Sequence, residues 1–254
     1  MLKKQNLFKF TLVVILLTCT CILWIKYDTN GLFDHSNIVH KKIIFNTSDL
    51  LEGDILFWKS IGTNDRAGHV AVISYVNNIQ KNIQIAHATN NPKYNAFVET
   101  YLLPSEKLRQ HNKHYFVIRI KDAEIRNQFI KIIHEWLKYK IKFNVKHEIL
   151  MNKWDDSMSY YSTKSKLQLQ HLMFSEKLLT NIADHSNLIA EQEYMCSEII
   201  IIALQKAFSV NNNKISNLPI SLKLDSILCP PSVMMLSLIH DHKNFQILGE
   251  INQK

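Results

Sequence analysis

Beyond its first 27 residues, this chain has short apolar runs typical of strands first and apolar residues at helical spacing later. The run at 69–76, HVAVISYV, is rich in β-branched residues and predicts a buried strand. Asn77-Asn78 then signals a turn, and the alternating run at 83–88, IQIAHA, predicts the second strand of a hairpin. Further short strands are predicted at 54–58, 115–120 and 245–251.

Helical patterns follow in the second half of the chain. Apolar residues three and four positions apart predict an amphipathic helix over 123–139. The run CSEIIIIALQKAF at 196–208 is apolar nearly all round and predicts a buried helix. Between them, 144–192 is polar, with one helical stretch at 167–182, and we expect a polar insertion there. Strands followed by helices predict the α+β class.

Composition excludes several classes of protein. The chain has 254 residues, of which 46% are hydrophobic and 20% charged, so it has enough apolar side chains for a full core and is not a disordered tail. Only 5 glycines and 5 prolines are present, which excludes collagen-like and low-complexity architectures.

The net charge of +8 does not indicate a nucleic-acid-binding protein. Lys3, Lys4, Lys9 and Lys26 belong to a segment without acidic residues, and the rest of the chain has 26 basic and 22 acidic residues. No basic helix or arginine-rich strip follows, although the sequence pI of about 9.2 is in the range of nucleic-acid binders. We therefore expect no nucleic-acid partner.

The first 27 residues form a separate segment. Lysines at the N-terminus precede an apolar run at 10–25, which is the pattern of a secretory signal. A full membrane span needs about 20 apolar residues, so both a cleaved signal peptide and an uncleaved signal-anchor remain open. Either one predicts an exported protein, periplasmic or at the cell surface, or one anchored in the membrane by 10–25; secretion as an effector is a further alternative. The expected organisation is 1–27 as signal or anchor and 45–254 as the folded domain, with the insertion at 144–192.

Two cysteines belong to the folded part of the chain, Cys196 and Cys229. They either pair in an oxidising compartment or leave a thiol nucleophile. Cys196 begins the predicted buried helix, where the helix dipole and free backbone N–H groups favour a thiolate and can stabilise an oxyanion. The alternative for Cys196 is a small buried core residue.

Two histidines occupy the predicted hairpin. His69 follows Gly68, a residue that lets another group approach closely, and His69 is a candidate general base for a thiol. If Val76 opposes Gln80, then His69 and His87 face each other, and His87 can orient the imidazole. A slip of one residue places the histidines on opposite faces of the sheet.

Four short segments together resemble a known family. They are EGDILF at 52–57, GHVAVI at 68–73, IAHA at 85–88 and YMCSEI at 194–199. In this order they resemble the permuted NlpC/P60 proteins, most closely the YiiX/YaeF-like permuted papain-like amidases, and more distantly the lecithin retinol acyltransferase-like enzymes. The resemblance implies an α+β fold of the papain type, circularly permuted so that the histidine precedes the cysteine.

The resemblance also implies roles for individual residues. Cys196 takes the place of the nucleophile, His69 that of the base, and His87 the third, polar position. Tyr194 takes the place of a tyrosine that lines the oxyanion or substrate site. Asp54 matches a structural Gly-Asp element. The chain departs from the YiiX-like group at His87, where that group more often has an acidic residue, and at 139–144, where a Gly-x-x-Tyr-Asp stretch is replaced by YKIKFN. The segment at 144–192 is longer and more polar than the resemblance implies, and we expect it to cover a substrate.

We therefore expect a cysteine hydrolase that cleaves amides through an acyl-thioester. The alternatives are a lipid acyl hydrolase or acyltransferase with the same residues, and a catalytically silent binding module tethered to a membrane. The expected partner is a small-molecule, peptide or lipid acyl substrate. We expect no cofactor and no metal, because His111 and His114, like His240 and His242, lack the companion ligands of a metal site.

Overall fold

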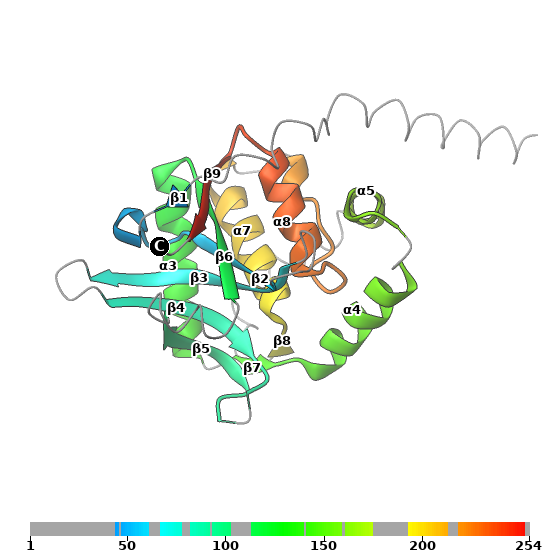
Figure 1. Cartoon of the computed structure of the whole chain (residues 1–254), viewed down its shortest axis with the longest axis horizontal. Helices are drawn as coiled ribbons and strands as arrows, with labels where there is room; N and C mark the ends of the chain where they lie inside the picture. The colour runs from blue at the N-terminus through cyan, green and yellow to red at the C-terminus, as the bar shows by residue number, and fades with distance from the viewer. Residues whose placement is uncertain are drawn as a thin grey trace, which may run out of the picture. The chain divides into compact units, whose positions relative to one another are not determined.

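The alternating segments form a nine-stranded sheet in the computed structural model (Figure 1). The residues that the structure describes are 44–45, 47–60, 67–77, 82–91, 93–102, 113–139, 141–158, 161–174, 193–212 and 218–251. The expected signal or anchor at 1–27 lies outside them. Within these ranges, no helix combines the length and the apolar character that a membrane span requires.

The sheet has the order β1-β9-β6-β2-β3-β4-β5-β7-β8. Its centre is antiparallel, and its two outermost pairs, β1 with β9 and β7 with β8, are parallel. Every strand predicted from the sequence is present, whereas β5 and the short β1, β7 and β8 were not predicted. The strands are β1 (Ile44–Phe45), β2 (Ile55–Ser60), β3 (Ala67–Asn77), β4 (Asn82–Thr89), β5 (Ala96–Tyr101), β6 (Lys113–Ile120), β7 (Lys142–Phe143), β8 (Glu193–Tyr194) and β9 (Phe245–Ile251).

The α-helices that the structure describes all come after β6 in the chain, with only β7, β8 and β9 placed between or after them, and this segregation confirms the α+β class. The two predicted helices at 123–139 and 196–208 are α3 and α7, while α4 and α8 were not predicted. The helical stretch predicted at 167–182 is α5, which begins earlier; residues 175–182 lie outside the described ranges. The helices are α3 (Ala123–Lys138), α4 (Val145–Ser157), α5 (Thr163–Met173), α7 (Cys196–Asn212) and α8 (Pro231–His240), with 3-10 turns η2 (Thr47–Asp49) and η6 (Ile220–Leu222).

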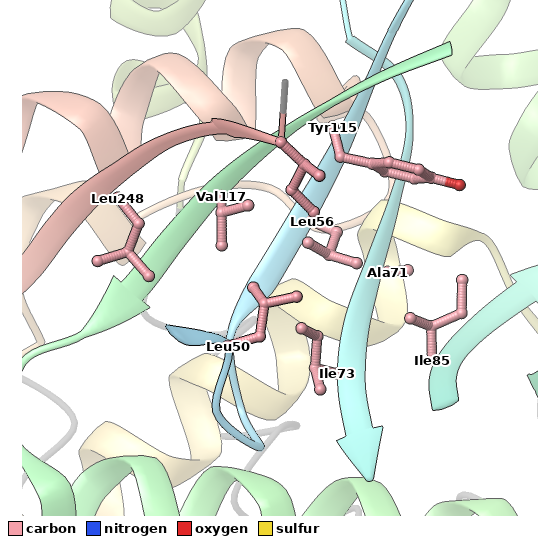
Figure 2. Packing of buried hydrophobic residues seen from close by; sticks show 9 residues of the cluster. Leu50, Leu56, Ala71, Ile73, Ile85, Tyr115, Val117 and Leu248 are labelled. Carbon is pink, nitrogen blue, oxygen red and sulfur yellow. The ribbon is translucent and has the colours of Figure 1, made fainter. Parts of the chain in front are cut away.

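The central strands are buried on both faces. Along β3, Val70 and Val72 alternate with Ala71 and Ile73, and all of them are fully buried. Ala71 and Ile73 belong to a hydrophobic cluster on one face of the sheet, shown in Figure 2 with part of α7 behind the strands. Helices α7 and α8 pack on β3, and α7 also packs beside α3 (Figure 1). Helix α7 is therefore buried nearly all round, as its sequence predicts.

The loop before β2 is held by a buried ion pair. Arg119 of β6 donates from Nε to Asp54 Oδ1 and from Nη2 to Asp54 Oδ2, each at 2.7 Å. Asp54 Oδ2 also accepts the backbone N–H of Leu51 at 2.8 Å. Gly53 has a φ of +87°, and a Cβ there would lie 2.7 Å from Arg126 Cγ, so this position requires glycine. Asp54 thus has the structural role expected of it.

The polar segment at 144–192 is partly integrated into the fold through paired polar groups. Helix α5 packs on α8, and its Gln170 donates to the Leu228 carbonyl at 2.7 Å and accepts from the Asp225 N–H at 3.2 Å. Lys166, also on α5, forms an ion pair with Asp155 of α4. These partners explain why a segment with a polar sequence contains buried residues.

Candidate active site

A row of side chains crosses one face of the central strands. Trp58 of β2 is directly opposite Tyr115 of β6 on one side and His69 of β3 on the other. The Trp58 ring centroid lies 5.0 Å from that of Tyr115 and 4.4 Å from that of His69. Tyr115 belongs to the hydrophobic cluster described above, and its ring extends toward β3 in Figure 2. The row therefore continues the buried cluster out to His69, which is half-buried.

The row continues from His69 to two further strands. His69 Nε2 lies 2.9 Å from His87 Nδ1, and His87 Nε2 lies 3.2 Å from Thr100 Oγ1 of β5. The two imidazole rings are nearly perpendicular, at 86°. The structure thus brings together the two histidines singled out by the sequence and adds a hydroxyl group beyond them.

The structure has neither the register in which Val76 opposes Gln80 nor histidines on opposite faces of the sheet. Val76 pairs with Ile83, not with Gln80. An irregularity between Ile73 and Tyr75 then shifts the register by one residue, so that Ile73 pairs with Ile85. Continued toward His69, this inner register places His87 opposite Ala71. His87 is therefore a diagonal neighbour of His69 on the same face of the sheet.

Cys196 lies beside the strand that carries His69. It is the first residue of α7 and is 7% exposed. The β3–β4 ladder ends where Val72 pairs with Ala86, and beyond this end the backbone N–H of Val70 lies near enough to the thiol to favour its charged form. Val70 directly follows His69 in β3, so the thiol lies beside the backbone next to His69. A Cβ added at Gly68 would meet no atom within 4 Å, so close packing does not explain that glycine.

Burial of the Cys196 thiol opposes the thiolate that a helix N-terminus favours. Burial raises the pKa of Cys196 to about 11 and outweighs the backbone N–H groups of Val70, Ser197 and Cys196 itself, which favour the charged form. The carboxylate of Glu148 on α4 raises this pKa further. The position at the helix N-terminus is as predicted, but desolvation is the larger effect on the thiol.

Tyr194 lies two residues before the cysteine, in β8. It is buried, and its backbone carbonyl accepts the N–H of Asn144 at 3.2 Å. Burial and the charge of Glu198 both raise the pKa of Tyr194. The side chain is therefore a neutral phenol near the start of α7, and its expected role at the oxyanion site stays a prediction.

A carboxylate fixes the first turn of α7. Glu198 is 2% exposed and accepts the backbone N–H of Met195 at 3.2 Å, which is half of a capping box. The same carboxylate lies 2.9 Å from His147 Nδ1 of α4. The hydrogen bond with Glu198 raises the pKa of His147. Helix α4 is thereby attached to the residues next to Cys196.

Two further sequence expectations concern cysteine pairing and metals. Cys196 and Cys229 are both buried and both free, so the alternative of a disulfide between them is not realised. In the part of the chain that the structure describes, no group of three or more His, Cys, Asp or Glu residues is placed to hold a metal. His111 lies outside that part.

Three residues of the site were missed in the sequence. Glu198 had a signal, because it stands three positions after the N-cap of a predicted helix, where a capping glutamate is common. Thr100 had none, because the strand that carries it, β5, was not predicted. His147 belongs to α4, which the sequence presented as part of a polar insertion.

Comparisons with family models, with curated proteins and with solved structures find no match for this chain. The geometry of the site is therefore the basis for assigning a function.

Proposed function

We propose that this protein is a cysteine hydrolase with a permuted papain-like arrangement, in which Cys196 is the nucleophile, His69 the base and His87 the group that orients His69. One observation carries the proposal. The Cys196 thiol, at the start of α7, contacts the backbone of Val70 in β3, immediately next to His69, and His69 Nε2 is held 2.9 Å from His87 Nδ1. In a catalytic triad, a base activates the nucleophile and a third group orients the base.

The reaction proceeds in two steps. Cys196 Sγ forms a bond to the substrate carbonyl carbon while the thiol proton passes to His69. The tetrahedral intermediate collapses, the C–N bond breaks, and His69 returns the proton to the leaving amine. Water then attacks the thioester carbonyl while His69 takes a proton from it, the C–S bond breaks, His69 returns the proton to Cys196 Sγ, and the carboxylic acid is released. Backbone N–H groups at the start of α7 stabilise the oxyanion of both intermediates.

The raised pKa of Cys196 determines how the thiol is activated. At neutral pH the resting pair is a neutral thiol and an imidazole, because burial disfavours the thiolate. Proton transfer to His69 then accompanies the attack, as it does for a serine nucleophile. We therefore expect reaction with an acyl donor to require His69, and simple alkylation of Cys196 at neutral pH to be slow.

Acylation of the full-length protein tests this proposal. The protein is incubated with a p-nitrophenyl acyl ester, and acyl groups on Cys196 and Cys229 are quantified by peptide mass spectrometry. Cys229 is an internal control, since burial raises its pKa well above the ordinary value and it is remote in sequence from the histidines. We expect a hydroxylamine-sensitive adduct on Cys196 that is lost in His69→Ala. Equal labelling of the two cysteines, or labelling unchanged by His69→Ala, would instead leave the silent binding module as the function.

A second candidate function, hydrolysis or transfer of lipid acyl groups, is favoured by the surface of α4. This helix carries Glu148, whose charge acts on Cys196, and it exposes Val145, Ile149 and Leu150, each about half exposed. Apolar side chains exposed next to a nucleophile suit an acyl chain or a lipid surface.

Substrate comparison distinguishes the two candidates. Acyl-chain amides and phospholipid esters are offered to the wild type and to Ile149→Ser/Leu150→Ser. If lipid is the substrate, the double variant loses activity on esters in vesicles and keeps its activity on soluble p-nitrophenyl esters. If amides are the substrate, the double variant matches the wild type on both.

A further inference from the structure

Thr100 extends the row of polar groups that begins at the candidate base. Its Oγ1 lies 3.2 Å from His87 Nε2, while the other ring nitrogen of His87 lies 2.9 Å from His69 Nε2. Thr100 pairs with Ile85 and His87 pairs with Val98, so Thr100 and His87 are diagonal neighbours on one face. Both nitrogens of His87 thus have a defined neighbour on a strand.

The chemistry of the proposed reaction selects one arrangement of protons along this row. A neutral imidazole has one N–H and one basic nitrogen. If His69 takes the thiol proton at Nδ1, its Nε2 must carry a proton and donate it to His87 Nδ1. His87 Nδ1 must then be unprotonated, so the proton of His87 resides on Nε2 and is donated to Thr100 Oγ1.

A hydroxyl group suits this position because it accepts a hydrogen bond without adding charge. A carboxylate there would favour a charged His87, with protons on both nitrogens, and Nδ1 would no longer accept from His69. A second cation would also oppose the imidazolium that forms on His69 during the reaction.

We infer that Thr100 is a positioning residue that holds His87 in the Nε2-protonated tautomer and thereby makes Nδ1 the basic nitrogen of His69. This inference rests on the proposed function for its catalytic consequence. The tautomer of His87 is a property of the resting protein and is measured without any substrate.

The test uses the full chain and four forms of it: wild type, Thr100→Val, Thr100→Ser and His87→Ala. Ring 15N chemical shifts of the histidines are measured by NMR, with His87→Ala identifying the signals of His87. We expect Nε2-protonated His87 in the wild type and in Thr100→Ser, and a mixture of tautomers in the near-isosteric Thr100→Val. Nδ1-protonated His87 in the wild type, or an unchanged tautomer in Thr100→Val, would overturn the inference.

Acylation of Cys196 is measured on the same proteins. We expect Thr100→Val to slow acylation about tenfold, the equivalent of one neutral hydrogen bond, and Thr100→Ser to restore the rate. A tautomer shift in Thr100→Val with no change in rate would overturn the catalytic part of the inference. If the wild type is not acylated, the proposed function fails, and the NMR result still decides the role of Thr100 toward His87.

Discussion

His69 and His87 share a face of the sheet because β3 carries an extra residue, Ser74, between them and the turn. The pairing of Tyr75 with Gln84, continued without interruption, would place the two histidines on opposite faces. The irregularity between Ile73 and Tyr75 adds one residue and restores the common face, which allows the 2.9 Å contact between His69 Nε2 and His87 Nδ1. The backbone carbonyl of Ser74 accepts a hydrogen bond from His134 Nε2 of α3 at 2.8 Å.

The first prediction concerns this bulge. His134→Ala removes the partner of the Ser74 carbonyl and should lower the free energy of unfolding by about 1 kcal/mol, a typical net value for one hydrogen bond. Ser74→Ala should instead be neutral or raise it by about 1 kcal/mol, because the buried Ser74 hydroxyl has no partner among the described residues. Urea denaturation of the two variants measures both effects. A loss of stability in Ser74→Ala equal to that in His134→Ala would contradict this account of the bulge.

The second prediction concerns the ion pair between Asp54 and Arg119, whose side chains are 0% and 16% exposed. Asp54→Ala leaves a largely buried guanidinium without its carboxylate, and we expect a loss of about 3–5 kcal/mol in the free energy of unfolding. Asp49→Asn is the control, because Asp49 contacts Arg119 through its backbone carbonyl, which this substitution preserves. Chemical denaturation should show little change in the control, and an equal loss in both variants would argue against the ion pair as the cause.

The third prediction is that the attachment of α4 weakens as pH rises. The hydrogen bond with Glu198 raises the pKa of His147 above its ordinary value of about 6.5, so the folded state binds the proton more tightly than the unfolded state. The stabilisation is fully present below pH of about 6.5 and is lost as pH rises through the raised pKa.

The comparison of wild type with His147→Gln between pH 5.5 and 9 measures this dependence. We expect the stability difference between the two proteins to be largest at the acidic end and to shrink toward pH 9. Lys146→Gln, an exposed neighbour on α4, is the control and should show no such trend. A difference that stays constant with pH would show that protonation of His147 does not contribute.

The fourth prediction is that a contribution of α5 to stability is lost as pH falls. Burial, with a smaller contribution from the charge of Lys223, lowers the pKa of His171 to about 4. Between about pH 4 and about pH 6.5, the unfolded state binds a proton at His171 and the folded state does not. The contribution of His171 to the free energy of unfolding is therefore fully present above pH of about 6.5 and falls toward pH 4. Replacement by a neutral residue of similar size, His171→Phe, should make the dependence of stability on pH smaller in this range. Thermal unfolding at pH 4.5 and 7 measures it, and an equal decrease in both proteins would assign the acid sensitivity to other groups.

Much of the fold follows from local patterns. Short continuous or alternating apolar runs predicted β2, β3, β4, β6 and β9, and helical spacing predicted α3, because each of these elements buries one face or both against a neighbour. β5 was not predicted, since its sequence AFVETY lacks a clear alternation and its outer residues are exposed. Helix α4 has no fully buried residue, so it has no apolar stripe to recognise in the sequence.

The sequence by itself determined which residues are candidates for the site. A cysteine before an apolar helix and histidines in alternating strands are local features, and they pointed to Cys196, His69 and His87. The tertiary structure decided how these residues relate. Register depends on a bulge that no local signal marks, the pKa of the thiol depends on burial, and Thr100 approaches His87 only through the pairing of β4 with β5. Each of these properties arises between segments that are separate in sequence, where desolvation and hydrogen bonding across strands act, and residue type alone does not determine them.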